Sequence, residues 1–525
     1  MLELNDDGIG IEEVIAVARR HAIVAPLSEA VIRRMDASRQ WVSLALRDGD
    51  RAIYGVNTGF GPLARTRIAP QQARQLSRNL ILNCAAGVGP PLPHDVVRAM
   101  MLIRANTLAK GYSGARPAVA QTLIDMLNAG VTPFVPSKGS LGASGDLAPL
   151  AHIAVVLTRD LDDGPDYSGQ AWHGGELLSG AEAMARAGIV RLIPEAKEGL
   201  ALTNGTDFMV AAGALALYDA LNVLEHAEVA AALSLEALLA LSEHYHPALH
   251  AANGQPGQIK TASRIRALVS GSQLIDTHPN RVQDAYSLRC VPQVLGPVRD
   301  ILAFLCDRFT GALNATSDNP LIFPSTADSP SFAVAGGNFH GQGPSLWLNF
   351  LGIAMASAGN IAERRVFRLL TPELSDGLPP MLVASSGIDS GLMISQYTAA
   401  ALVSDNKTLA HPDSVDSIPS SANQEDFVSM GANAARHTME IIENVRHIIA
   451  IELLTAAQAI DLRPDGPARL GAGTAAAYKS IRSRVTFLAH DRQTTPDIEA
   501  LADLIVSGEL LRAIRQVGDD VKGSL

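Results

Sequence analysis

From Gly199 onward, apolar residues recur at helical spacing over long segments. In Met439–Leu453, isoleucine and valine side chains return every three or four residues, and most charged side chains fall between them. Leu346–Ala362 and Leu392–Leu402 show the same spacing. Alanine and leucine fill most apolar positions and only 4% of the residues are aromatic, a composition that favours helices over strands. The sequence therefore predicts a mainly α fold built on a long central helix bundle.

The N-terminal part of the chain has a different character. Its apolar segments are shorter and are separated by loops rich in glycine and proline, such as Tyr54–Pro62 and Pro133–Gly145. A chain of 525 residues is also too long for one ordinary core. We therefore expect two domains, a loop-rich mixed domain over residues 1–220 and a central and C-terminal helical bundle over residues 221–525.

Composition and charge exclude several classes of protein. The formal net charge of -11, with no Lys/Arg cluster, argues against nucleic acid or an acidic membrane surface as a partner. The three cysteines form no CxxC pair, and the chain has no HExxH motif or dinucleotide fingerprint, so we expect neither a metal nor a dissociable cofactor. The N-terminus is acidic, and no apolar run reaches the length of a membrane span. These features predict a soluble cytoplasmic protein.

The segment Gly139–Leu147 has the composition that an internal cyclisation would need. The nitrogen of Gly145 must attack the carbonyl of Ala143, so the side chains between them must be small, and Ser144 can then lose water to become an alkene. Glycines in this segment permit the tight backbone that brings those atoms together. Downstream, residues 146–157 are predicted to form a helix whose positive N-terminal end would face the new ring.

The same tripeptide also suits a simpler interpretation. Alanine, serine and glycine are abundant in this chain, and a serine-glycine turn that caps the following helix would have the same residues. The tripeptide alone therefore does not decide between an electrophile and a turn, and the rest of the chain must be considered.

The run GSLGASGDLAPLAH at residues 139–152 resembles the prosthetic-group loop of the histidine/phenylalanine/tyrosine ammonia-lyase family. Further similar segments follow in the family's order over nearly the whole chain, and together they are closest to histidine ammonia-lyase. They are Tyr54–Gly61, Ala201–Thr206, Gln283–Arg289, Ser317–Pro320, Gly336–His340 and Ser421–Asp426.

The resemblance implies how the electrophile is made and used. In this family Ala143, Ser144 and Gly145 would become 4-methylidene-imidazol-5-one (MIO), and the enzyme would expel ammonia from an aromatic L-amino acid without oxidation. An electrophile that captures the amine improves a poor leaving group. Tyr54 matches the catalytic tyrosine of the family. Its ordinary pKa of about 10 would have to fall, or its phenolate be stabilised, for it to act as a base.

The resemblance also assigns residues that hold the substrate. Arg289 matches the clamp for the substrate carboxylate, because its planar charged fork suits a two-oxygen anion. Tyr286, about one helical turn earlier, would take part in catalysis at the same site. Asn204 and Gln283 would donate hydrogen bonds to the ring or the substrate, and Phe339 would form an aromatic wall. In the family these residues come from different subunits, which implies a homotetramer with shared active sites.

The pattern is less uniform for the choice of substrate. Glu425 matches the acidic residue that faces the imidazole in histidine ammonia-lyases, and a carboxylate suits a ring N–H. However, Asn83-Cys84 stands where histidine enzymes typically have Ser-His. Histidine, giving urocanate, is the first prediction. A tyrosine or phenylalanine ammonia-lyase, a 2,3-aminomutase and a lyase for a modified histidine remain alternatives.

Two other classes of protein fit the sequence less well. Fumarase-like lyases are also helical tetramers, but their Gly-Ser-Ser-rich loop with Met-Pro and Lys is not found in this sequence. An inactive helical scaffold is the second class. The joint presence of Tyr54, Ser144, Asn204 and Arg289 argues against it.

Overall fold

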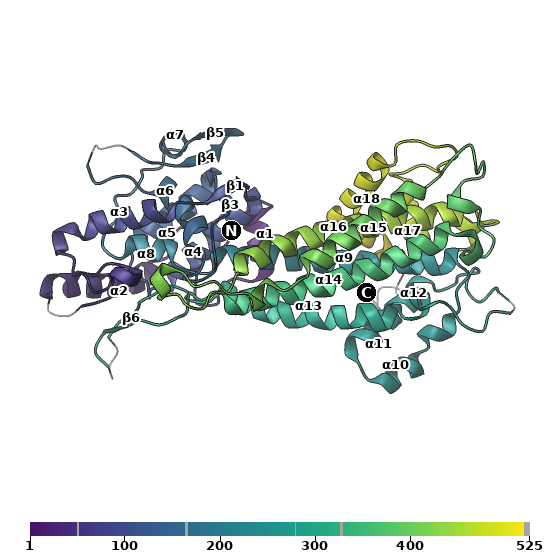
Figure 1. Ribbon diagram of the computed structural model, residues 1–525, viewed down its shortest axis with the longest axis horizontal. Coiled ribbons are helices and arrows are strands. Elements are labelled where there is room, and N and C mark those ends of the chain that lie inside the picture. Colours follow the sequence, from purple (N-terminus) through teal and green to yellow (C-terminus); the bar gives the residue numbers. More distant parts are fainter. Residues whose placement is uncertain (50–51, 163–165, 279, 326–328, 519–525) are drawn as a thin grey trace. The chain divides into compact units, whose positions relative to one another are not determined.

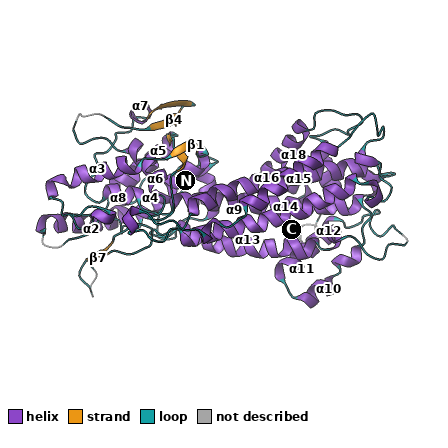
Figure 2. Cartoon of the chain, viewed as in Figure 1, coloured by secondary structure: helices purple, strands orange, loops and turns teal. Residues whose placement is uncertain are grey.

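The computed structural model describes residues 1–49, 52–162, 166–278, 280–325 and 329–518 (Figure 1). Helices dominate the described residues, and the strands are few and short (Figure 2). The predicted mainly α fold is therefore confirmed. Contacts group the chain into two compact units. The first consists of Met1–Leu215, Cys306–Asn349 and Pro412–Arg436, and the second of Ala216–Leu305, Phe350–His411 and His437–Leu525.

The first unit combines medium-length helices with three small sheets. Among its helices, α4 forms the core, because every residue from Val96 to Ala109 is buried. The strands make two two-stranded sheets, β1-β3 and β6-β7, and a three-stranded sheet in the order β2-β4-β5. The strands are β1 (Val88–Pro91), β2 (Thr132–Pro133), β3 (Pro136–Lys138), β4 (Gln170–His173), β5 (Glu176–Ser179), β6 (Leu321–Phe323) and β7 (Phe332–Val334). The helices are α1 (Ile11–Ala18), α2 (Glu29–Asp48), α3 (Ala73–Cys84), α4 (His94–Ala109), α5 (Pro117–Ala129), α6 (Leu147–Leu157), α7 (Gly180–Arg186) and α8 (Glu198–Thr203).

Four long helices contribute residues to both units. They are α9 (Asp207–Ala237), α13 (Val291–Leu313), α14 (Gln342–Leu370) and α16 (Gly431–Asp461). The other helices of the second unit are α10 (Pro247–Asn253), α11 (Pro256–Leu268), α12 (Tyr286–Arg289), α15 (Met393–Leu409), α17 (Ala472–Arg482), α18 (Thr495–Ser507) and α19 (Glu509–Arg515).

Helix α16 shows why the apolar periodicity becomes a helix bundle. Its predicted apolar side is buried, with Ile441, Val445 and Ile448 at most 1% exposed, whereas Glu440 is exposed. Burying a side chain of this size stabilises the fold by about 1.5–3 kcal/mol, so a repeated apolar side holds the helix in place. The second unit also buries an ion pair, between Arg365 of α14 and Glu452 of α16, with both side chains 0% exposed.

The grouping differs from the predicted division at residue 220 in three segments. Residues 306–349 and 412–436 lie in the predicted C-terminal domain but group with the N-terminal unit, and residues 216–220 group with the second unit. The reason is that the long helices carry the chain out of one unit and back into it. A division by position along the sequence cannot place such returning segments.

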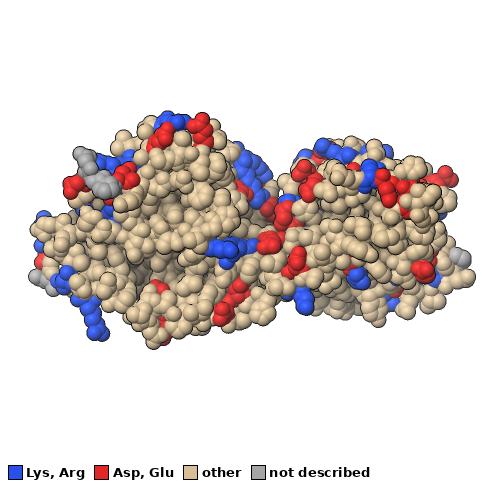
Figure 3. Space-filling view, turned by 45° about the horizontal axis from the view of Figure 1, so that its top comes forward, with Lys and Arg blue, Asp and Glu red and all other residues tan. Residues whose placement is uncertain are grey.

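Two helices, α9 and α14, are long and apolar enough to cross a membrane by length and composition alone. Within their most apolar windows, 78% and 61% of the residues are buried inside the structure, as is usual for core helices of a globular protein. Figure 3 shows Lys and Arg side chains interspersed with Asp and Glu on one face, without a continuous basic patch among the residues that the structure describes there.

Candidate active site

The loop Gly142–Asp146 connects β3 to α6 and has a backbone that only small residues allow. Gly142 and Gly145 adopt positive φ angles of +68° and +73°, and Ala143 between them is buried. A Cβ atom on Gly145 would lie 2.1 Å from the carbonyl oxygen of Gly205, so no larger residue fits there. The loop is therefore tight where the predicted cyclisation would take place.

Helix α6 begins directly after this loop, as the sequence predicted. It runs from Leu147 to Leu157, and Pro149 lies in its first turn, where a missing N–H is tolerated. Asp146, the residue before the helix, donates its backbone N–H to the Gly205 carbonyl at 2.6 Å. The partial positive charge of the helix N-terminus therefore lies next to Ser144 and Gly145 in the chain.

The side chain of Asp146 links the loop to a second helix N-terminus. Its Oδ2 accepts hydrogen bonds from the N–H groups of Phe208 and Met209, in the first turn of α9, at 2.9 and 3.0 Å. Its Oδ1 accepts one from the Ser140 hydroxyl at 3.0 Å. Complete burial raises the pKa of Asp146 to about 7, even though these donors favour the charged form.

Asn204 holds the Ser144 backbone from the other side and is itself supported by a buried arginine. The amide Nδ2 of Asn204 donates to the Ser144 carbonyl at 2.8 Å. Arg104 of α4 donates to the carbonyls of Asn204 and Ala201, both at 3.0 Å, and it pairs with Asp207 at the start of α9. Arg104 and Asp207 are 1% and 0% exposed. A buried charged pair thus fixes the turn that carries Asn204.

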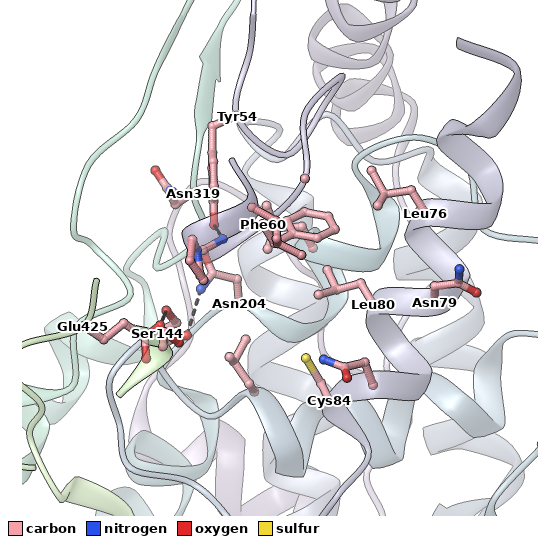
Figure 4. A pocket seen from close by; sticks show the side chains of 18 of the residues that line it. Tyr54, Phe60, Leu76, Asn79, Leu80, Cys84, Ser144, Asn204, Asn319 and Glu425 are labelled. Atoms are coloured by element: carbon pink, nitrogen blue, oxygen red, sulfur yellow. Dashed lines mark hydrogen bonds between the residues drawn. The ribbon is translucent and has the colours of Figure 1, made fainter. Parts of the chain in front are cut away.

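A cavity of about 660 Å³ opens above Ser144. Figure 4 shows Ser144, Asn204 and Glu425 on one side of it and the apolar residues Leu76 and Leu80 on the other. The lining residues are Tyr54, Gly59, Phe60, Gly61, Pro62, Leu63, Thr66, Ile68, Leu76, Asn79, Leu80, Asn83, Cys84, Ser144, Leu147, Leu200, Asn204, Asn319, Phe339, Ser421 and Glu425.

Glu425 lies next to the serine that would become the electrophile. The Ser144 hydroxyl donates to Glu425 Oε1 at 2.7 Å, although 281 residues separate the two in sequence. The Ser420 hydroxyl donates to the other oxygen, Oε2, at 2.8 Å. The carboxylate is therefore placed within reach both of the loop and of a ligand in the cavity.

Tyr54 points its hydroxyl into the same cavity. Its Oη accepts a hydrogen bond from the Gly61 N–H at 3.3 Å, and its ring meets Phe60 edge-on at 6.2 Å between centroids. Burial raises the pKa of Tyr54 above its ordinary value; the Gly61 N–H opposes this rise and the charge of Glu425 adds to it. The phenol is consequently protonated in the resting site at neutral pH.

One face of α3 forms the far wall of the cavity. Leu76, Leu80 and Cys84 follow one another at four-residue intervals and so share a face of the helix, and Asn83 lies beside them. Burial raises the pKa of the Cys84 thiol to about 11, and the charge of Glu425 contributes to the rise. This wall therefore presents apolar side chains and a neutral thiol. An imidazole in place of the Cys84 thiol would make the wall basic.

Five of the predicted site residues are not among the described lining residues: Ala143 and Gly145, which flank Ser144 in the loop, and three residues far from the loop in sequence. Gln283, Tyr286 and Arg289 belong to the second unit, where Arg289 donates to the Gln283 Oε1 at 2.6 Å and lies 6.0 Å from the Tyr286 ring centre. Tyr286 is 76% exposed. The described residues that line the cavity include no lysine or arginine.

The sequence prediction missed several residues at the site. Leu76 and Leu80 could have been found from their spacing to Cys84 on a predicted helix. Phe60 and Asn319 lie in segments that resemble the family, but the resemblance implies no role for either residue. Ser420 begins the polar loop 420–426, whose side chains suggest a functional role, but its own role could not be predicted, because a serine beside a turn is common and its contact with Glu425 depends on the folded loop. In the described part of the chain, no group of three or more His, Cys, Asp or Glu side chains could hold a metal ion.

Comparison with known proteins gives consistent results. Residues 9–483 match the family described as aromatic amino acid lyase. The chain is 47% identical to a histidine ammonia-lyase of Treponema denticola over 499 residues, which cover 95% of each protein. A crystal structure of histidine ammonia-lyase from Trypanosoma cruzi is similar with a TM-score of 0.88 and 36% identity, covering 100% of this chain and 97% of that one. A tyrosine aminomutase structure from Streptomyces globisporus has a TM-score of 0.90 and 36% identity, with 99% of each chain covered. With this coverage and this site geometry, the chain belongs to the aromatic amino acid lyase family and is a carbon–nitrogen lyase.

Proposed function

We propose that this enzyme eliminates ammonia from L-histidine to give urocanate, using MIO formed from Ala143, Ser144 and Gly145. The observation that carries the proposal is the hydrogen bond between the Ser144 hydroxyl and Glu425 Oε1, which puts the future electrophile and a ring acceptor in one cavity. The 47% identity to a histidine ammonia-lyase supports the same substrate.

The loop has the features that MIO requires. Its two glycines have positive φ angles, Gly145 packs against the Gly205 backbone, and Asn204 Nδ2 already holds the Ser144 carbonyl. The first turn of α6 begins three residues after Ser144 and can withdraw electron density from a ring formed there. When formed, MIO supplies an electrophilic alkene that turns the substrate amine into a better leaving group.

The remaining chemistry falls to side chains of this chain. Tyr54 Oη faces the cavity and would accept the proton that leaves the substrate β-carbon, so it must first lose its own proton. Because burial raises the pKa of Tyr54, the phenol is protonated at neutral pH, and the deprotonated fraction that can act as a base grows as the pH rises. Glu425 would accept a hydrogen bond from the imidazole N–H. Asn204 would hold the electrophile in its position at Ser144.

We further propose that the functional enzyme is a homotetramer in which another copy supplies Arg289, Tyr286 and Gln283. The lack of lysine and arginine among the described lining residues supports this, because a substrate carboxylate needs a cation. Exposed apolar side chains on α14 also support it. Phe350 and Ile353 are 44% and 43% exposed on neighbouring turns of this helix, as expected for a surface that another chain covers.

An absorbance assay for the unsaturated acid tests the substrate. It should be run on histidine, tyrosine, phenylalanine and substituted imidazole amino acids with the wild type and with Glu425→Gln. We expect histidine to be the best substrate and phenylalanine the worst, because a carboxylate facing a plain phenyl ring is left without a donor. If phenylalanine is preferred, or if Glu425→Gln leaves the ranking unchanged, Glu425 does not recognise the ring.

A ring O–H is the second candidate for the group that Glu425 binds. The thiol of Cys84 and the amide of Asn83 stand where an imidazole is typical, and the structural similarity to a tyrosine aminomutase favours a phenol. The same assay covers tyrosine, and chromatography for a β-amino acid separates a lyase from an aminomutase. All three cysteines are free, which fits the proposed cytoplasmic location.

A further inference from the structure

Ser420 and Glu425 close a short loop through three hydrogen bonds. The backbone N–H of Ser420 donates to the Glu425 carbonyl at 2.9 Å, and the N–H of Glu425 donates to the Ser420 carbonyl at 3.3 Å. The third bond joins the side chains, from the Ser420 hydroxyl to Glu425 Oε2 at 2.8 Å. Ser420 is partly buried and is not itself one of the cavity-lining residues, whereas its side-chain partner Glu425 is.

The two oxygens of the Glu425 carboxylate differ in whether they would keep their hydrogen-bond donor when MIO forms. In the described residues each accepts one hydrogen bond, and both donors are serine hydroxyls, Ser144 on Oε1 and Ser420 on Oε2. Formation of MIO removes the Ser144 hydroxyl as water. Oε1 then loses its donor, whereas Oε2 keeps its own.

We propose that Ser420 is a positioning residue that turns the Glu425 carboxylate so that Oε1 is offered to the ring N–H of the substrate once Ser144 has been consumed. This inference rests on the proposed function, which makes Glu425 the ring acceptor. Before maturation Ser144 occupies that acceptor, so the recognition site is completed by the same step that creates the electrophile.

The orientation matters because a carboxylate on a flexible side chain can rotate. With Oε2 tethered, the side chain is already ordered before a ligand arrives, and binding costs less conformational entropy. Hydrogen bonds to a charged acceptor are also the stronger kind, so fixing the acceptor has a measurable effect on affinity. Ser420 would therefore act on ring recognition and would have no part in ring closure.

Equilibrium binding separates this role from catalysis. Full-length Ser144→Ala protein cannot form MIO, and its Oε1 has no serine donor, as in the mature site. Calorimetric titration of this protein with imidazolepropionate and with phenylpropionate measures recognition of the ring without turnover. Adding Ser420→Ala should weaken imidazolepropionate about tenfold, which corresponds to about 1.4 kcal/mol, and leave phenylpropionate unchanged. Ser420→Thr keeps a hydroxyl and should restore the affinity.

Two controls complete the design. Ser417 lies in the same segment, and its hydroxyl accepts the Val428 N–H at 3.0 Å, so Ser417→Ala perturbs the segment without removing the bond to Glu425. It should leave the binding of both ligands unchanged. In the otherwise natural chain, Ser420→Ala should still mature, with an intact mass lower by two waters, about 36 Da.

Each contrary result has a distinct meaning. Equal weakening of both ligands by Ser420→Ala, or loss of maturation, shows that Ser420 is merely structural and overturns the proposal. If Glu425→Gln weakens imidazolepropionate but Ser420→Ala does not, Ser420 has no positioning role while the proposed function stands. If Glu425→Gln has no effect either, ring recognition by Glu425 is wrong and this inference falls with it.

Discussion

Replacing Arg104 by lysine should remove the support beneath Asn204 and reduce formation of the prosthetic group. A lysine ammonium can still pair with Asp207, but it cannot also reach the carbonyls of Ala201 and Asn204, to which Arg104 donates at 3.0 Å each. Two buried hydrogen bonds to carbonyls are worth about 1–1.5 kcal/mol each, so the free energy of unfolding should fall by about 2–3 kcal/mol. The same change frees Asn204, which holds the Ser144 carbonyl.

A second arginine of the same helix provides a matched control. Arg98 of α4 is 2% exposed and donates to the carbonyls of Val17, Ala18 and Leu127, at the ends of α1 and α5. Arg98→Lys should destabilise the protein by a similar or larger amount, because three bonds are affected. It touches neither Asn204 nor the loop that carries Ser144.

Urea unfolding and intact-mass measurement separate the two effects. Both variants should unfold at lower urea concentration, and in both cases the soluble folded fraction is analysed for mass. Only Arg104→Lys should contain a substantial fraction of chains that have not lost two waters, about 36 Da. Equal maturation of the two variants would refute the claim that Arg104 acts through Asn204 on the loop.

Four further outcomes follow from the site. The intact mass of the purified protein should already lack two waters; Ser144→Ala should abolish the near-ultraviolet absorbance, and borohydride should inactivate the wild type. Arg289→Lys should lower kcat/KM, with a loss of transition-state stabilisation of at least about 2 kcal/mol, because a point charge does not replace a bidentate clamp. A near-normal kcat/KM would make Arg289 structural. Turnover should rise with pH as Tyr54 loses its proton, since burial raises its pKa; Tyr54→Phe should lose this dependence together with most of the activity. Asp146 should make the folded protein less stable as pH rises from 3.8 to about 7, because the folded state keeps a proton that the unfolded state has lost; urea unfolding of Asp146→Asn should show a flatter pH dependence.

Local patterns predicted more of this protein than long-range ones did. The apolar side of α16 and the start of α6 after Asp146 follow from spacing and from the tolerated position of Pro149, and the structure has both. Both are properties of a few consecutive residues. The tripeptide Ala143–Gly145 alone left both a cyclised electrophile and a simple serine-glycine turn open, and the family resemblance favoured the electrophile.

The parts that were not foreseen depend on which distant segments meet. The bond between Ser144 and Glu425 joins residues 281 positions apart, and neither residue indicates the other. Ser420 gains its partner only because the chain folds back between 420 and 425. Arg289 was assigned by resemblance, and its meeting with the cavity stays a prediction that depends on a second chain.

The wide separation of the loop and its supports has a consequence for synthesis of the protein. Residue 144 leaves the ribosome well before Asn204, and Glu425 follows Ser144 by 281 residues. At 5–20 residues per second, that interval is roughly 15–55 s. Throughout this interval the serine lacks its carboxylate partner, and until Asn204 has been made, 60 residues after Ser144, it lacks its amide support as well. If the proposed MIO formed only once these partners were in place, its reactive alkene would be kept away from the thiols and amines of the cell until the residues that enclose it had been made.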